Sequence, residues 1–300
     1  MKNVDIKGII VPIVTPMNDD ESLNLEELSV QAERMIENGI HGIFCFGTNG
    51  EGYILNGKEK RQILETIVKT VNNRVPVYAG TGCVSTKETI EQSLMAKEVG
   101  ADVLSIITPS FAKASQEELF CHYKTIADAV DMPIILYNIP ARTGNTLEPE
   151  TVEKLIVCKN IVGIKDSSGV WENIGAYLEV AKKRKDFAVL SGNDSLILNT
   201  LKHNGKGAIA GCANVYPHTL ASIYNLYKEG DLEKAEKAQN SIASLRAVFK
   251  YGNPNTIIKK AVNLLGYQVG ECRAPFNGIS EEGYMALKTV LEKNKQLGLY

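Results

Sequence analysis

Short runs of β-branched and aliphatic residues alternate with longer amphipathic stretches through the first two-thirds of this 300-residue chain. Such alternation predicts βαβ units, in which the strands are parallel. Strands are expected at residues 8–14, 42–46, 76–79, 103–107, 134–137, 161–165, 187–190 and 207–209. Helices are expected between them, for example at residues 25–38, 58–71, 86–99, 116–130 and 150–157. Eight is the number of strands that closes a parallel barrel.

The alternative to a barrel is an open, doubly wound sheet. No expected strand is followed by GxGxxG, and the segment GTNGEG at residues 47–52 fits neither that spacing nor a Walker A loop. We therefore predict an α/β fold, a (β/α)8 TIM barrel, at residues 1–230. Only helical patterns follow, and they predict a three-helix appendage packed on the barrel at residues 231–300. Its helices are expected at residues 232–249, 255–265 and 281–295.

Composition and charge exclude several classes of protein. The chain is 44% hydrophobic and 23% charged with a net charge of −2, so it lacks the basic field that nucleic acid or an anionic membrane requires. No apolar stretch approaches twenty residues, and the N-terminus does not resemble a signal peptide. The six cysteines are scattered without a CxxC pair. We expect a cytoplasmic protein with reduced thiols and no metal site.

Lys165 ends the expected sixth strand, after an apolar run at residues 161–164. Burial disfavours the charged form of such an amine. One interpretation is a lysine that ends the strand and reaches solvent or a neighbouring carboxylate. The other is a neutral, nucleophilic amine that condenses with a carbonyl substrate. Alternation along the strand places Ile161, Gly163 and Lys165 on one face and Asp166 on the other, so an inward Lys165 would be separated from that carboxylate.

The expected fifth strand ends in Tyr137. Catalytic groups of such barrels lie at the carboxyl ends of the strands, and neighbouring strands are about 4.8 Å apart. The Tyr137 phenol can therefore reach a group attached to Lys165 and act as general acid and base while a carbinolamine forms or breaks. The glycine-rich loop at residues 47–52 lies at the same end, where its backbone N–H groups are suited to holding a carboxylate.

Four segments resemble, in sequence, order and spacing, those of the dihydrodipicolinate synthase/N-acetylneuraminate lyase family. They are GTNGEG at 47–52, YNIPARTG at 137–144, GIKDSSG at 163–169 and SGND at 191–194. The resemblance covers essentially the whole chain. It implies a (β/α)8 barrel with a C-terminal helical region, a homotetramer arranged as a dimer of dimers, and a lysine Schiff base with pyruvate or another 2-keto acid. An aldehyde is the second partner, and no metal or organic cofactor is implied.

The resemblance also implies roles for individual residues. Lys165 corresponds to the Schiff-base lysine and Tyr137 to the proton shuttle, with Thr48 assisting it. The remaining positions at the keto-acid pocket are Gly47, Asn49, Gly192 and Ile209.

Two residues bear on the second substrate and indicate different family members. Arg142 matches the arginine with which the synthase binds a substrate carboxylate, a task that suits a guanidinium fork. Phe111 stands where a neighbouring subunit lends a tyrosine to the proton relay, and a phenyl ring carries no proton. Asn49 also replaces the second threonine of the synthase loop.

From these departures we predict a class I lyase that acts as an aldolase on a 2-keto-3-deoxy sugar acid or a 4-hydroxy-2-oxo acid. The alternative is dihydrodipicolinate synthase (4-hydroxy-tetrahydrodipicolinate synthase), which condenses pyruvate with aspartate semialdehyde. A keto-acid-binding barrel without turnover is the third interpretation.

Overall fold

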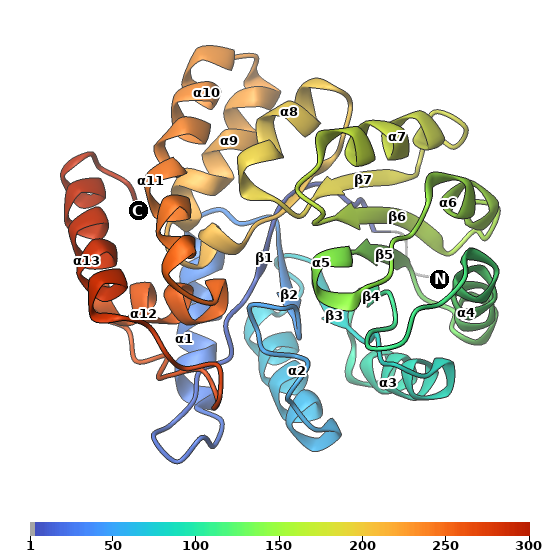
Figure 1. Cartoon of the computed structure of the whole chain (residues 1–300), viewed down its shortest axis with the longest axis horizontal. Helices are drawn as coiled ribbons and strands as arrows, with labels where there is room; N and C mark the ends of the chain where they lie inside the picture. The colour runs from blue at the N-terminus through green and yellow to red at the C-terminus, as the bar shows by residue number, and fades with distance from the viewer. Residues whose placement is uncertain (1–3) are drawn as a thin grey trace.

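The computed structural model describes residues 4–300, and its eight parallel strands close into a barrel (Figure 1). The strands are β1 (Gly8–Pro12), β2 (Gly42–Cys45), β3 (Val77–Gly80), β4 (Val103–Ile107), β5 (Ile134–Asn138), β6 (Ile161–Asp166), β7 (Ala188–Ser191) and β8 (Gly207–Ile209). Each strand pairs with the next, and β8 pairs with β1. The predicted TIM barrel is confirmed, and each expected strand is present with ends shifted by at most two residues.

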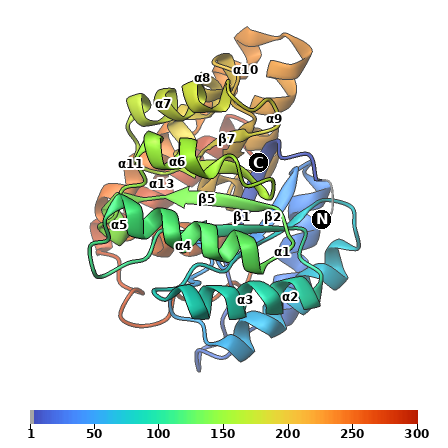
Figure 2. The same cartoon turned by 90° about the vertical axis from the view of Figure 1, so that its right-hand side faces the viewer.

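Helices surround the barrel (Figures 1 and 2). They are α1 (Leu25–Glu37), α2 (Gly57–Val71), α3 (Thr86–Val99), α4 (Gln116–Ala129), α5 (Pro140–Thr143), α6 (Pro149–Leu155), α7 (Trp171–Ala181), α8 (Ile197–Lys202) and α9 (Pro217–Glu229), with 3-10 turns η1 (Asp194–Leu196) and η2 (Gly211–Asn214). The Ser85 and Ser115 side chains cap α3 and α4, because each accepts a hydrogen bond from a first-turn N–H. Among residues 4–300, no helix is long and apolar enough to cross a membrane.

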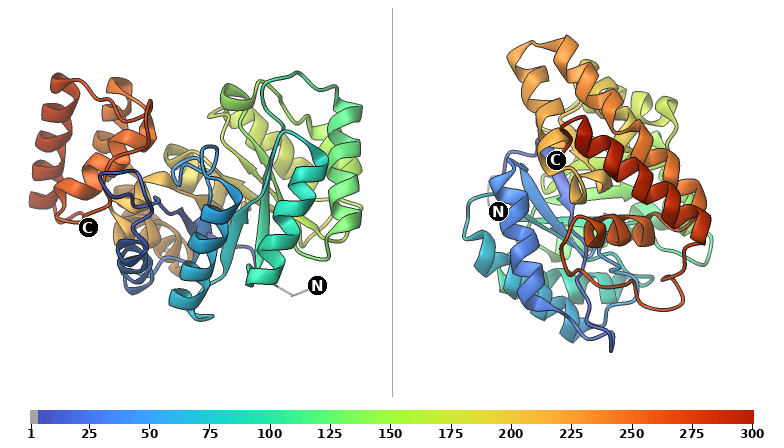
Figure 3. Two further views of the ribbon diagram at one scale, coloured as in Figure 1. Left: turned by 90° about the horizontal axis from the view of Figure 1, so that it is seen from below. Right: turned by 90° about the vertical axis from the view of Figure 1, so that its left-hand side faces the viewer.

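The chain after residue 230 is helical and lies to one side of the barrel (Figures 1 and 3). Its elements are α10 (Leu232–Ser241), α11 (Ala243–Ala247), η3 (Val248–Tyr251), α12 (Pro254–Leu264) and α13 (Glu281–Gln296). The single helix expected at 232–249 is wrong, because the chain breaks after Ser241, whose hydroxyl donates to the Ala238 carbonyl, a bond that competes with the helix ladder. We keep the boundary between residues 230 and 231 as a proposal.

Side chains on the two faces of the strands form separate apolar clusters. The smaller cluster fills the barrel interior and includes Phe44, Ile135 and Leu190, while the larger one packs between the strands and the helices. The expected side-chain orientations are wrong at the start of β6. The pairing of β5 with β6 shifts by one residue after Ile134, so Val162 packs with the interior cluster and Ile161 with the outer one. Beyond the shift, the expected alternation holds through the carboxyl end of β6.

Candidate active site

Lys165 lies on β6 with its side chain inside the barrel, as the alternation along the strand predicted. It stands in register with Tyr137 of β5 and Leu190 of β7, whose side chain belongs to the interior cluster. Lys165 is 4% exposed, and its Nζ lies 3.8 Å from the centre of the Tyr137 ring and 5.4 Å from that of Phe44. The interpretation in which this lysine reaches solvent is therefore wrong.

Asp166, the next residue, points to the other face of β6. It is fully buried and accepts hydrogen bonds from Asn138 Nδ2 at 2.7 Å and from Ser168 Oγ at 2.5 Å. Burial raises the pKa of Asp166, although these hydrogen bonds oppose the shift. No ion pair among residues 4–300 includes Lys165. The amine therefore faces the cavity and the Tyr137 ring, where a substrate carbonyl could reach it.

Tyr137 is placed to move protons at the amine. Its hydroxyl lies 3.3 Å from Thr48 Oγ1, and its side chain is 3% exposed. Burial alone would raise the pKa of Tyr137, but the charge of Lys165 and hydrogen bonds with Thr48 and Ser167 outweigh it, so the pKa lies below its ordinary value. A phenol that loses its proton more readily, next to a reacting amine, suits general acid and base chemistry.

The loop at residues 47–52 supplies groups that can bind an anion. Within residues 4–300, the backbone N–H groups of Thr48 and Asn49 donate to no acceptor. The Thr48 carbonyl is instead occupied, because it accepts from Asn255 Nδ2 at 2.7 Å and from the Glu51 N–H at 3.1 Å. Thr48 and Asn49 line the same cavity of about 210 Å³ as Lys165. Unpaired backbone donors beside a cavity are suited to a carboxylate.

The pocket walls require residues without bulk at two points. A Cβ atom at Gly192 would lie 2.8 Å from Lys165 Cε, and one at Gly47 would lie 2.9 Å from the Phe44 ring. Larger residues would push the lysine or the loop out of place. Ile209, on β8, is 1% exposed and lines the same cavity as Lys165 and Gly192. The structure therefore brings these predicted pocket residues together.

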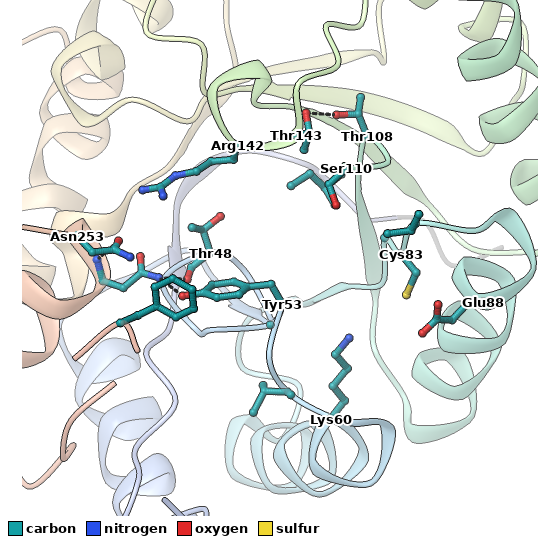
Figure 4. A pocket seen from close by; sticks show the side chains of 17 residues that line it. Thr48, Tyr53, Lys60, Cys83, Glu88, Thr108, Ser110, Arg142, Thr143 and Asn253 are labelled. Atoms are coloured by element: carbon teal, nitrogen blue, oxygen red, sulfur yellow. Dashed lines mark hydrogen bonds between the residues drawn. The ribbon is translucent and has the colours of Figure 1, made fainter. Parts of the chain in front are cut away.

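Arg142 extends the site toward solvent. It lies on α5, is exposed, and lines both the cavity of Lys165 and an adjoining cavity of about 490 Å³. Figure 4 shows the second cavity, with Arg142 on one side and Thr48 and Tyr53 on another. A guanidinium here can bind an acidic group of a molecule that reacts at Lys165.

Phe111 is the predicted residue that the single chain does not bring to the site. It is fully exposed, lies between β4 and α4, and lines neither cavity. Its φ of +76° is uncommon for a residue with a side chain. Its neighbour Ser110 does line the outer cavity.

Two residues at the site were not predicted from the sequence. Ser167 lines the same cavity as Tyr137 and Lys165 and lies just after the carboxyl end of β6, and this position was a signal that could have identified it. Asn255 lies 207 residues from Thr48, and no local pattern marks it. In the part of the chain that the structure describes, no three His, Cys, Asp or Glu side chains gather where they could hold a metal ion.

Comparison with known proteins agrees with this geometry. The model of the dihydrodipicolinate synthetase family matches residues 5–294. A 4-hydroxy-tetrahydrodipicolinate synthase of Methanopyrus kandleri is 40% identical over 96% of this chain and 96% of its own. A crystal structure of a dihydrodipicolinate synthase has a TM-score of 0.92 at 36% identity, covering 98% of this chain and all (100%) of its own.

A second solved structure is that of YagE, a prophage protein of the same family from E. coli K12, in complex with pyruvate. It has a TM-score of 0.93 at 31% identity and covers 97% of this chain and 99% of its own. These likenesses extend over nearly the whole length of every chain compared. The chain therefore belongs to the dihydrodipicolinate synthetase family and is a lyase of the Schiff-base, class I aldolase type.

Proposed function

We propose that Lys165 forms an imine with pyruvate as the first step of carbon–carbon bond formation. The amine adds to the keto carbon to give a carbinolamine, and loss of water gives the imine. Loss of a proton from the adjacent methyl carbon gives an enamine, whose electron pair attacks an aldehyde carbon. The observation that carries the proposal is the Lys165 amine, buried against Tyr137 with no carboxylate partner among residues 4–300.

The second substrate that we propose is aspartate semialdehyde, which makes the chain a 4-hydroxy-tetrahydrodipicolinate synthase. Arg142 supports this choice because it lines the cavity of Lys165 and is free to bind the carboxylate of that aldehyde. Relatives that are about 40% identical over nearly the full length bear the name of the synthase. This proposal replaces the sequence-based preference for a sugar-acid aldolase, which depended on Phe111.

An aldolase for a 2-keto-3-deoxy sugar acid or a 4-hydroxy-2-oxo acid is the second candidate. One observation favours it: Phe111 offers no hydroxyl for a proton relay, and Ser110 beside it offers no phenol. We also propose the homotetramer implied by the family resemblance. Phe111 is fully exposed on a single chain and is therefore accessible to a second copy.

Two experiments test these proposals in turn. Incubation with pyruvate and borohydride should reduce the imine and leave a stable adduct on Lys165, with Lys165→Met as the unlabelled control. A coupled assay should then give a higher kcat/KM for condensation with aspartate semialdehyde than for cleavage of keto-deoxy acids or 4-hydroxy-2-oxoglutarate.

An Arg142→Ala variant should lower kcat/KM for the semialdehyde by about 10- to 100-fold, the scale of a hydrogen bond to a charged group, while pyruvate labelling is retained. Faster cleavage of a keto-deoxy acid would establish the second candidate. An adduct without turnover of any tested substrate would identify a binding protein, and the absence of any adduct would exclude imine chemistry.

A further inference from the structure

Helix α12 reaches the loop at residues 47–52 through two side chains. Asn255 Nδ2 donates to the Thr48 carbonyl at 2.7 Å. One helical turn later, Lys259 Nζ lies 2.6 Å from Glu51 Oε1, and the two residues are 1% and 0% exposed. The C-terminal part of the chain is thus tied to both halves of the loop that lines the Lys165 cavity.

The Asn255 bond to the Thr48 carbonyl, together with a bond from the Glu51 N–H at 3.1 Å, sets the direction of a donor beside the cavity. The Thr48 carbonyl and the Asn49 N–H belong to one planar trans peptide and therefore point in opposite directions. Because the carbonyl is turned toward α12, the Asn49 N–H points away from α12. That N–H has no acceptor within residues 4–300, and Asn49 lines the cavity of Lys165.

The ion pair holds the other half of the loop in a conformation that is costly by itself. Glu51 has a φ of +55°, which residues with a side chain rarely adopt. Its Oε2 accepts from the Arg273 N–H at 2.9 Å, and Lys259 also donates to the Glu271 carbonyl at 2.8 Å. Without Lys259, the buried Glu51 carboxylate would lose its opposite charge. The cost of a buried, uncompensated charge would then favour a rearrangement of the loop.

We propose that Asn255 and Lys259 are positioning residues that make the site selective for a carboxylate. They hold residues 48–51 in a backbone conformation in which the N–H groups of Thr48 and Asn49 can donate to the carboxylate of the keto acid. The inference rests on the proposed imine at Lys165 and extends it, because it predicts a preference for 2-keto acids over neutral ketones. It assigns that preference to two side chains of α12, a helix in the C-terminal region that follows the barrel.

The test compares borohydride trapping of pyruvate with that of acetone, a ketone without a carboxylate. We expect Asn255→Ala to raise the half-saturating pyruvate concentration about 5-fold, the scale of one neutral hydrogen bond. Lys259→Met should raise it about 10-fold or more, because it leaves Glu51 without its opposite charge. Trapping of acetone should change less than about 2-fold in both variants, since acetone does not use the loop.

Lys260→Met is the matched control. Lys260 is the next residue on α12, and its Nζ pairs with the Glu271 carboxylate at the surface, 2.5 Å away. It should leave both trapping reactions unchanged. If Lys259→Met does not fold, the double variant Glu51→Gln/Lys259→Met removes both charges and keeps an acceptor for the Arg273 N–H. It should still show a selective loss for pyruvate, because the ion pair between α12 and the loop is absent.

Each outcome separates this inference from the proposed function. An unchanged ratio of pyruvate to acetone trapping in folded Asn255→Ala and Lys259 variants would overturn the inference and leave the imine chemistry intact. An equal decrease for both ketones would also overturn it, because that result indicates a general disturbance of Lys165. Failure of the unaltered protein to trap either ketone would overturn the proposed function itself.

Discussion

Two buried lysines in this chain differ in almost everything except their burial. Lys165 is 4% exposed inside the barrel, and an aromatic ring lies 3.8 Å from its Nζ. Lys259 is 1% exposed between α12 and the β2–α2 loop, and a carboxylate oxygen lies 2.6 Å from its Nζ. Burial alone therefore does not make a lysine reactive. We infer that the group facing the amine decides whether the amine can act as a nucleophile or forms one half of an ion pair.

The difference arises from the elements that carry the possible partners. Asp166 is adjacent to Lys165 in sequence, yet the alternation of a strand turns it to the opposite face, where Asn138 and Ser168 hydrogen-bond it. Glu51 is distant from Lys259 in sequence, yet the packing of α12 on the loop brings the two side chains together. Strand alternation thus keeps Asp166 away from Lys165 although the two are adjacent in sequence. Tertiary packing brings Glu51 to Lys259 although the two are far apart in sequence.

The largest expected effect is that of Lys165→Met. Loss of the nucleophile should lower lyase activity by at least about 10³-fold and abolish borohydride labelling. Thermal stability should be retained or raised, because an apolar side chain replaces an amine in an apolar interior. The checks are turnover, mass spectrometry of the labelled peptide and a melting curve. Labelling that persists at another lysine would show that Lys165 is not the reactive amine in the comparison with Lys259.

Lys259→Met should lower stability in addition to its effect on pyruvate trapping. Removal of one partner leaves the buried Glu51 carboxylate without compensation, at a cost of about 3–5 kcal/mol in the free energy of unfolding. Denaturant unfolding of the variant, compared with Glu51→Gln/Lys259→Met, measures that cost. The double variant should recover part of the loss because no charge remains buried alone. A single variant as stable as the unaltered protein would show that the pair contributes little.

Tyr137→Phe tests whether the hydroxyl beside Lys165 transfers protons during catalysis. Removal of the hydroxyl should lower kcat by about 10²-fold, the usual scale of general acid–base catalysis, while the ring still packs on Lys165. Because the pKa of Tyr137 is below its ordinary value, the phenol loses its proton at a lower pH than a free tyrosine. The rate of the unaltered enzyme should fall as the pH rises through that pKa, and this alkaline decrease should be absent in the variant. A pH–rate profile with the same alkaline limb in both proteins would assign that limb to another group.

The smallest effect is expected for Lys260→Met, the third lysine in the comparison. Lys260 and its partner Glu271 are 22% and 49% exposed, and partly solvated ion pairs contribute about 0–1 kcal/mol to stability. Urea unfolding at low and high salt should show little change in stability relative to the unaltered protein. A loss as large as that of Lys259→Met would mean that position on α12, and not the buried ion pair, determines stability.

The amino-acid sequence predicted the barrel because its strands and helices have strong local periodicities. The same periodicity placed Lys165 inward, although it misplaced Ile161, since a register shift between β5 and β6 depends on the pairing of two strands. The break after Ser241 was also missed, because an apolar helical pattern continues across it. Local patterns thus determined the element types, and contacts between elements determined their interruptions.

The sequence by itself determined that Lys165 and Tyr137 lie at the carboxyl ends of neighbouring parallel strands, one residue before each strand stops, because the strand and helix periodicities are properties of the local chain. Tertiary structure alone decided what surrounds each amine. It assigned Asn255 to the Thr48 carbonyl and Glu51 to Lys259, across more than two hundred residues. Such contacts follow from how helices pack on loops in three dimensions, and no spacing along the chain encodes them.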